Sequence, residues 1–315
     1  MSSILVTGAS GLIGGRIAAR LSERGFDVIG IDARPPKTPD VPYSFIAGDI
    51  NDTHRLHAAT IRKPLEAIVH CGGISGLMVA RNNPFLICET NIRGTAQVFE
   101  LARIRTVRRV VFCSTLMVYG GQNDGALTEA SPLMPASVYA ASKVAGEAIL
   151  RAYAEEHRVD GVALRISHVY GPGRETQCFI RQMIEDGIAR RPTLLPHARR
   201  SRRQYVYVDD VVDAILLAVM APHMPQRAYN IASHEQLTIE EVAQVARHVL
   251  GPIEVGFDDA NDPPEYQMGK LDISAAMRDL GFAPRRSLEE GIALYAKWLR
   301  SATDAVKKGI VQTTG

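Results

Sequence analysis

Residues 4–14, ILVTGASGLIG, decide the fold that this sequence predicts. The first four residues are apolar or β-branched, which is typical of a short buried strand. Gly8, Gly11 and Gly14 follow directly and open a helical pattern. Glycines in such a strand-to-helix turn let backbone amides and the helix dipole face a pyrophosphate, because no Cβ stands in the way. The stretch therefore predicts a dinucleotide-binding turn, although a tight turn without a ligand would use the same glycines.

Acidic residues after the next two predicted strands favour the dinucleotide. Asp32 closes the second strand, about 20 residues beyond the glycines, where a carboxylate can accept hydrogen bonds from ribose hydroxyls. Its charge would repel a 2′-phosphate, so NAD is favoured over NADP, although Arg34 lies close by. Asp49 and Ile50 follow the third strand and are expected to flank the adenine; the alternative is an exposed turn.

Short apolar runs alternate with longer amphipathic stretches along the first half of the chain. This alternation predicts an α/β fold with a Rossmann-type, doubly wound parallel sheet. A smaller, interleaved C-terminal lobe is expected to bind substrate. We expect an NAD-binding domain over residues 1–170, the lobe over 171–300 and a loosely held tail over 301–315. The predicted strands cover residues 4–7, 28–31, 67–70, 110–114 and 161–166.

Composition excludes several classes of partner. The net charge of +2 arises from 36 basic and 34 acidic residues, so nucleic acid and membrane surfaces are not expected as partners. No apolar run approaches the roughly 18 residues of a membrane span, and no leader segment is expected. The four cysteines form no C-x-x-C pair, which fits neither a disulfide framework nor a zinc site. We therefore expect a cytoplasmic protein without a metal.

The predicted chemistry centres on Tyr139 and Lys143, four residues apart in a helical stretch. That spacing places both side chains on one helix face. A tyrosine loses its proton near pH 10, so it acts as a base at neutrality only beside positive charge. A solvated helix face would show the same spacing. Ser114 and Thr115 end a strand, where a hydroxyl can hold the reacting oxygen beside the tyrosine.

Taken together, these motifs resemble the extended short-chain dehydrogenases/reductases, and within them the NAD-dependent epimerase/dehydratase family. The resemblance covers residues 4–299. Beyond the glycine turn and the Tyr139/Lys143 pair, it rests on HCGG (70–73), NIRGT (91–95), STLMVYG (114–120), LRISHVYGPG (164–173), RQYVYVDDV (203–211), YNIAS (229–233) and LGFAPRRSLEEGI (280–292).

The resemblance implies roles for individual residues. Tyr139 is the expected acid/base, Lys143 its electrostatic support and a ribose ligand, and Thr115 the active hydroxyl. The cofactor is NAD, and the substrate a nucleotide sugar or sugar acid. The expected cofactor contacts are Gly8, Gly11, Leu12, Ile13, Gly14, Asp32, Asp49, Ile50, Cys71, Gly72, Gly73, Asn91, Ser114, Tyr139, Lys143 and His168, and the expected substrate contacts are Ser75, Thr115, Leu116, Tyr139, His168 and Arg203.

Two positions after Thr115 narrow the reaction. Sugar-nucleotide dehydratases of this family carry an Asp-Glu pair there, because eliminating water needs a further acid and base. Here the pair is Leu116 and Met117, so dehydration is disfavoured. A nucleotide-sugar 4-epimerase that removes and returns hydride through a keto intermediate is the leading interpretation. The alternatives are an NAD-dependent dehydrogenase of a sugar, sugar acid or small hydroxy acid that releases NADH, and a non-catalytic NAD-binding sensor.

The substrate end departs from the family pattern. Arg203 matches the arginine that pairs with the substrate phosphate, but His168 replaces an asparagine and the basic HARRSRR replaces a Gly-Asp-Gly turn. Arg199, Arg200 and Arg202 add positive charge, and Arg81 is a further substrate candidate; each also suits a solvated loop. The helical stretches 85–105 and 138–157 resemble those that pair across a two-fold axis in the family, so a homodimer is expected.

Overall fold

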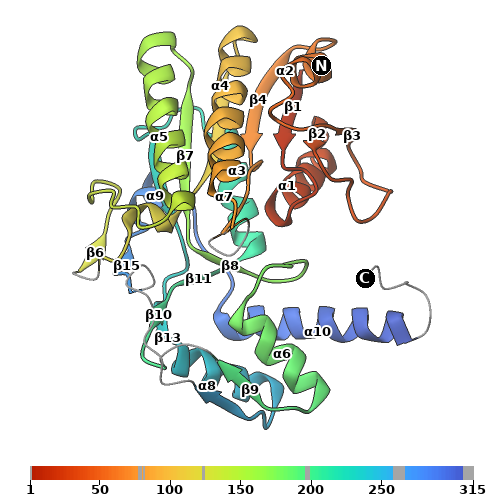
Figure 1. Ribbon diagram of the computed structural model, residues 1–315, viewed down its shortest axis with the longest axis vertical. Coiled ribbons are helices and arrows are strands. Elements are labelled where there is room, and N and C mark those ends of the chain that lie inside the picture. Colours follow the sequence, from red (N-terminus) through yellow and green to blue (C-terminus); the bar gives the residue numbers. More distant parts are fainter. Residues whose placement is uncertain are drawn as a thin grey trace.

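A parallel seven-stranded sheet forms the centre of the protein (Figure 1). The structure is a computed structural model that describes residues 2–76, 80, 82–122, 125–195, 199–257 and 267–307, with side chains of the last helix described up to residue 302. The strand order is β12-β7-β5-β4-β1-β2-β3. The strands are β1 (Ser3–Thr7), β2 (Asp27–Asp32), β3 (Ser44–Ala47), β4 (Leu65–His70), β5 (Arg109–Thr115), β7 (Gly161–Ile166) and β12 (Ala228–Ile231).

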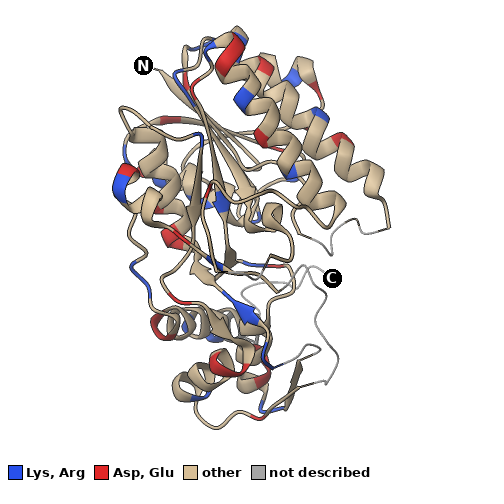
Figure 2. Cartoon of the chain, turned by 90° about the vertical axis from the view of Figure 1, so that its left-hand side faces the viewer, with Lys and Arg blue, Asp and Glu red and all other residues tan. Residues whose placement is uncertain are grey.

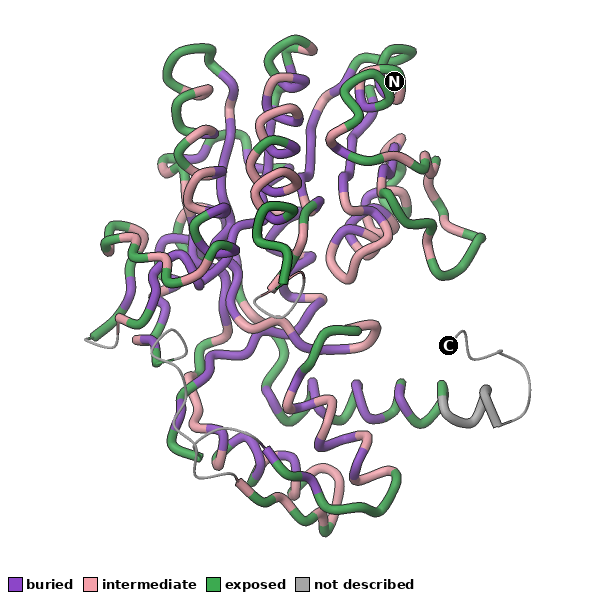
Figure 3. Tube along the Cα trace, viewed as in Figure 1, coloured by how far each residue is buried: buried purple, intermediate pink, exposed green. Residues whose placement is uncertain are grey.

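Helices cover both faces of this sheet. Apolar side chains of α1 and α7 pack on one face and those of α2 and α4 on the other, together with part of α5. Because both faces are covered, β1, β5 and β7 are buried along their whole length (Figure 3). The helices are α1 (Leu12–Glu23), α2 (Thr53–Thr60), α4 (Thr95–Ile104), α5 (Val138–His157) and α7 (Val208–Met220).

The predicted fold class is confirmed, and all five predicted strands lie within two residues of the observed bounds. Two strands of the sheet had no predicted bounds: β3, which was expected before Asp49 without a stated range, and β12, which was missed. The chain returns to the sheet with β12, which pairs with β7 in parallel although it follows α7. Because β12 comes from the predicted lobe, lobe and sheet are interwoven, and the domain boundaries proposed above stay a prediction.

A second, smaller core lies below the carboxyl ends of the strands (Figure 1). Strands β8 and β11 connect it to the sheet and pair in parallel, with His168 opposite Tyr205. Its main elements are β8 (His168–Tyr170), α6 (Phe179–Ala189), β9 (Thr193–Leu195), β10 (Arg202–Arg203), β11 (Tyr205–Tyr207), β13 (Leu237–Thr238), α8 (Ile239–Leu250), β14 (Val255–Phe257) and α10 (Leu288–Lys307).

Further short elements pack beside the sheet and its helices. Helix α10 continues past residue 301, where the loosely held tail was expected to start, to Lys307. Among the helices of the described ranges, none is both long and apolar enough to span a bilayer. Both basic and acidic residues lie along the helices of the described ranges (Figure 2). The short elements are α3 (Pro84–Cys88), the π-helix η1 (Glu89–Gly94), the 3₁₀-helix η2 (Leu116–Tyr119), β6 (Ala126–Leu127), β15 (Lys270–Leu271) and α9 (Ser274–Leu280).

Candidate active site

The glycine turn between β1 and α1 leaves a backbone-lined space that side chains at Gly8 and Gly14 would fill. We call this space the cradle. Gly8 has φ +70°, and a Cβ there would lie 2.7 Å from the Gly72 nitrogen. A Cβ on Gly14 would overlap the Gly8 carbonyl oxygen. Helix α1 starts after Gly11 without a side-chain cap, so its first amides are left for an anion. The turn fits the pyrophosphate of a dinucleotide.

Asp32 lies at the end of β2, beside this turn. One carboxylate oxygen accepts a hydrogen bond from the Ser10 amide and the other from the Arg34 amide, each at 3.0 Å. These bonds fix the carboxylate orientation, and each oxygen keeps a lone pair for a ribose hydroxyl. Only the backbone of Arg34 touches Asp32 in these bonds.

Asp49 and Ile50 lie at the next strand end in different environments. Asp49 is exposed and accepts a bond from the Asn51 amide at 2.8 Å. Ile50 is 6% exposed and packs against Gly94. A Cβ added to Gly94 would lie 2.7 Å from the Ile50 side chain. Their contact with the adenine stays a prediction.

The loop after β4 is held by a buried histidine. His70 contacts the Thr7 hydroxyl at 2.6 Å and the Thr95 hydroxyl at 3.0 Å, and Thr7 Oγ1 accepts a bond from the Gly72 amide. Burial, with the nearby charge of Lys143, lowers the pKa of His70 to about 3. The neutral imidazole can thus donate to one hydroxyl and accept from the other, which fixes the loop against the glycine turn.

Asn91 lies in the π-helix η1 and secures the same loop. Its side-chain oxygen accepts a bond from the Ile74 amide at 2.8 Å, and its side-chain nitrogen donates to the Ile74 carbonyl and to the Ser142 hydroxyl, each at 3.0 Å. π-helical turns often mark functional sites. The amide is thus occupied by the protein itself, so Asn91 supports the loop, and its predicted cofactor contact is not among these bonds.

Tyr139 and Lys143 are both buried on α5, with 7% and 6% exposure. The Lys143 ammonium donates to the Cys113 carbonyl at 2.9 Å and lies 4.8 Å from the centre of the Phe112 ring. It also lies 4.0 Å from where a Cβ on Gly73 would stand. Lys143 is therefore fixed between β5 and the loop after β4, which rules out the solvated helix face for this pair.

Ser114 and Thr115 point to opposite faces of β5, since side chains alternate along a strand. The Ser114 hydroxyl donates to Glu147 on α5 at 2.5 Å. Thr115 Oγ1 accepts a bond from the Met117 amide at 3.3 Å, and its own proton stays available. Leu116 and Met117 are buried in the apolar core, so the positions that carry the acid and base of a dehydratase hold no titratable group.

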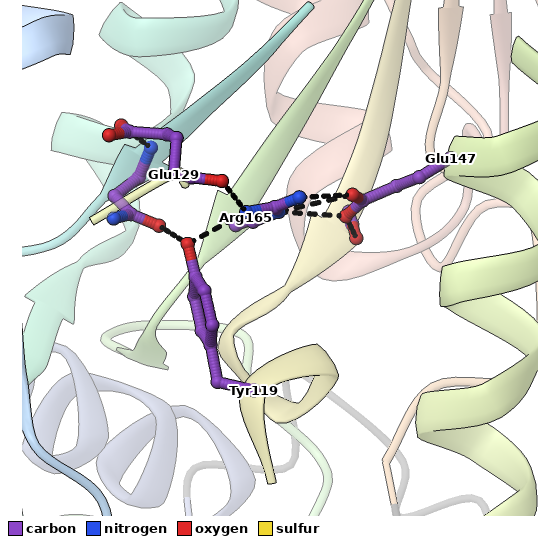
Figure 4. Close-up of polar contacts among 6 residues, drawn as sticks. Tyr119, Glu129, Glu147 and Arg165 are labelled. Carbon is purple, nitrogen blue, oxygen red and sulfur yellow. Dashed lines mark hydrogen bonds and ion pairs between the residues drawn. The ribbon is translucent and has the colours of Figure 1, made fainter. Parts of the chain in front are cut away.

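Glu147 of α5 is part of a buried ionic network with Arg165 (Figure 4). It pairs with Arg165 of β7 at 2.7 Å, and the two side chains are 8% and 2% exposed. Arg165 also donates to the Tyr119 hydroxyl at 2.9 Å and the Glu129 carbonyl at 3.0 Å. The network joins α5, β5, η2 and β7. Sequence reasoning missed Glu147, although it stands four residues after Lys143 on the same helix face.

His168 and Arg203 come together at the entrance of the second core. His168 opens β8, and burial, reinforced by Arg203 and Arg174, lowers its pKa to about 3. Its Nδ1 atom is buried and has no hydrogen-bond partner within the described residues. Arg203 is 4% exposed. A neutral imidazole beside two guanidinium groups can bind an anionic or polyhydroxylated ligand.

The remaining predicted residues are spread around this centre. Leu12 and Ile13 are half-buried at the start of α1. The loop after β8 lies against the same helix, because Arg16 of α1 donates a hydrogen bond to the Pro172 carbonyl at 2.9 Å. Ser75 is exposed. Arg199, Arg200 and Arg202 are also exposed, and Arg199 stacks on Phe257. Arg81 lies outside the described residues. Of the arginine cluster, only Arg203 is buried beside His168.

Cys71 and Cys113 are neighbours in space, which their separation in sequence did not suggest. The sulfurs of Cys71 and Cys113 lie 3.3 Å apart. Cys71 follows β4, Cys113 lies in β5, and all four cysteines are free thiols. The adjacency arises from strand pairing, because His70 lies opposite Phe112 and the next residues are these cysteines.

Comparison with known proteins agrees with this geometry. The model of the NAD dependent epimerase/dehydratase family matches residues 4–232. The chain is 31% identical over 313 residues to a UDP-glucose 4-epimerase of Mycolicibacterium smegmatis, covering 94% of this chain and 98% of that one. It is 27% identical to a mouse (Mus musculus) dTDP-D-glucose 4,6-dehydratase, covering 94% and 88%. A Thermus thermophilus UDP-glucose 4-epimerase complex with NAD superimposes with a TM-score of 0.85, at 29% identity, covering 95% and 99%.

Proposed function

Because the chain belongs to the NAD dependent epimerase/dehydratase family, we propose that this NAD-dependent enzyme is a nucleotide-sugar 4-epimerase. The observation that carries the proposal is the buried set Thr115, Tyr139 and Lys143, with apolar Leu116 and Met117 beside it. The set can move one proton at a hydroxyl-bearing carbon. It lacks the extra carboxylates that elimination of water requires.

NAD is expected along the cradle, with its pyrophosphate at Gly8, Gly11 and Gly14 and a ribose at Asp32. When bound, it supplies the oxidant that takes up a hydride and the reductant that returns it. Gly72 and Gly73 are expected to face it from the loop after β4.

Tyr139 and Thr115 act on the substrate hydroxyl in this proposal. Thr115 donates a hydrogen bond to the reacting oxygen, and Tyr139 takes the hydroxyl proton as the carbon is oxidised. Lys143 lies one helical turn from Tyr139, and its positive charge favours the phenolate that this step needs. After the sugar ring turns over and the carbon is reduced on its other face, Tyr139 returns the proton to the same oxygen.

His168 and Arg203 are proposed to bind the remainder of the substrate. The buried Arg203 suits a phosphate of the nucleotide, because guanidinium groups pair with phosphates in a fork geometry. His168 can donate to an oxygen of the same group, since its Nδ1 atom is unpartnered within the described residues. Ser75 and Leu116 are proposed to line the sugar side.

The same basic corner favours a second candidate function. Arg174 and Arg203 both lie close enough to His168 to lower its pKa, so the corner also suits the carboxylate of a sugar acid. An NAD-dependent dehydrogenase of such an acid would use the same Tyr139 and Lys143 and release NADH.

A direct assay separates the two functions. The purified protein is tested for co-purified NAD, then incubated with UDP-sugars and, separately, with aldonic and uronic acids. Epimerised UDP-sugar without net NADH, lost in Tyr139→Phe, supports the epimerase. NADH accumulation with free acids alone contradicts it and establishes the dehydrogenase. Bound NAD without turnover of any substrate would support the sensor.

The setting of the enzyme belongs to the same proposal. A reducing, cytoplasmic environment is supported by the four free thiols. A homodimer is supported by the exposed apolar side chains of α3, α4 and the start of α5, namely Phe85, Leu86, Ile104 and Val138. Light scattering on the purified protein tests the homodimer, and a monomeric mass at micromolar concentration would contradict it.

A further inference from the structure

Cys71 directly follows β4 and Cys113 lies in β5, so each cysteine is one residue beyond the paired residues His70 and Phe112 of these parallel strands. Such strands run about 4.7–4.9 Å apart, and a disulfide needs Cα atoms about 4.4–6.8 Å apart. Their sulfurs are already 3.3 Å apart. A bond between them would therefore need a side-chain adjustment of about 1 Å and no rearrangement of the sheet.

The pair is also unequal in reactivity. The hydrogen bond between the two thiols, in which either sulfur can donate, lowers the pKa of the Cys113 thiol, and the charge of Lys143 adds to this effect. The same hydrogen bond and burial raise the pKa of Cys71. A thiolate is the reactive form of cysteine, and a neighbouring thiol can resolve its oxidised product. Cys113 is thus the more acidic thiol of the pair, and Cys71 is the more exposed one.

We propose that Cys71 and Cys113 form an oxidative modification site that a hydroperoxide converts into a reversible disulfide. The Cys113 thiolate attacks a peroxide oxygen, the O–O bond breaks, and Cys113 becomes a sulfenic acid as water or an alcohol leaves. The Cys71 sulfur then attacks the sulfenic sulfur, the S–S bond forms, and the hydroxyl leaves as water with the Cys71 proton. Two thiols lose two electrons, and the peroxide is reduced.

The location connects this modification to catalysis, a part of the inference that rests on the proposed function. The Cys113 carbonyl holds the Lys143 ammonium, and Cys71 precedes the Gly72 amide that meets the glycine turn. A displacement of about 1 Å in catalytic geometry can cost about 100-fold in rate. The disulfide should therefore lower turnover by about 10- to 100-fold, and a dithiol reductant should restore it.

Mass spectrometry on the wild-type protein tests the site without any activity. The protein is treated with hydrogen peroxide, free thiols are alkylated, and the digest is searched for a peptide pair joined through residues 71 and 113. The linked pair, lost on treatment with dithiothreitol, is the expected result. Alkylation of both cysteines at peroxide concentrations that oxidise Cys88 would overturn the proposal.

Activity measurements on three variants test the consequence. Cys71→Ser and Cys113→Ser, each compared with its own untreated sample, should lose the dithiothreitol-reversible inactivation, whereas Cys88→Ser, half-buried in α3, should keep it. A linked pair that leaves turnover unchanged would overturn the link to catalysis. If the reduced protein turns over no substrate, the proposed function fails while the disulfide mapping still stands.

Discussion

Replacing Glu147 by glutamine should destabilise the protein strongly, because it leaves the Arg165 charge buried without its partner. The Arg165 side chain is 2% exposed and the Glu147 side chain 8%. Removing one member of a buried ion pair costs about 3–5 kcal/mol in free energy of unfolding. Arg165 keeps its bonds to the Tyr119 hydroxyl and the Glu129 carbonyl, so we expect the lower end, about 3 kcal/mol.

Equilibrium unfolding in urea measures this loss, as the shift of the midpoint multiplied by the m value. Glu185→Gln is the matched control: Glu185 pairs with Arg181 at 2.8 Å on the surface of α6, with side chains 40% and 31% exposed. Exposed pairs of this spacing contribute about 0.3–0.5 kcal/mol. If Glu147→Gln lowers the free energy of unfolding by less than about 1 kcal/mol, with an unchanged m value, Glu147 and Arg165 do not form a buried ion pair in which each charge needs the other.

Three further predictions concern the cofactor, the chemistry and pH. Gly14→Ala should abolish NAD binding measured by calorimetry, because the added Cβ overlaps the Gly8 carbonyl oxygen. The control Gly256→Ala, whose Cβ would make only ordinary contacts, should bind NAD normally. Equal affinities of the two variants would contradict the assignment of the glycine turn as the NAD-binding site. Tyr139→Phe should retain NAD but lose about 10²–10⁴-fold in turnover; a near-normal rate would exclude Tyr139 as the acid/base. His70 has its pKa lowered from 6.5 to about 3, so the unfolded chain binds the proton first and stability falls as pH drops below about 6.5. From pH 7 to pH 5 this contributes a loss of about 2 kcal/mol, which His70→Gln should remove from the pH dependence of urea unfolding; parallel wild-type and variant curves would disprove it.

Local patterns accounted for much of the fold and for the centre of the site. The glycine turn, Asp32 at a strand end and the Tyr139/Lys143 spacing each involve a few neighbouring residues whose geometry follows from strand and helix periodicity. They therefore placed both ends of the site at the carboxyl edge of a parallel sheet. Strand β12 was missed because Asn230 interrupts its sequence AYNI, which therefore lacks the continuous apolar run that indicated the other strands.

The substrate side was harder to predict because its residues come from separate elements. Three arginines of one short segment, Arg199, Arg202 and Arg203, have the same side chain and similar neighbours in sequence. Of these three, Arg203 alone is buried beside His168. Its selection depends on the antiparallel pairing of β10 with β13, which turns Arg203 inward and Arg202 outward. Strand alternation predicts that two successive arginines differ but not which one faces the site, so the choice of Arg203 came from the resemblance to the family.

The sequence by itself determined five strands of the sheet, the glycine turn and the spacing of Tyr139 and Lys143, since each depends on spacings within one strand, turn or helix. The tertiary structure alone decided that Lys143 is held by the Cys113 carbonyl, that Glu147 meets Arg165, and that Cys71 meets Cys113. These contacts join different strands and helices. Which residues meet in these contacts depends on strand order and register. The packing of the whole core sets both, and no short stretch of sequence predicts them.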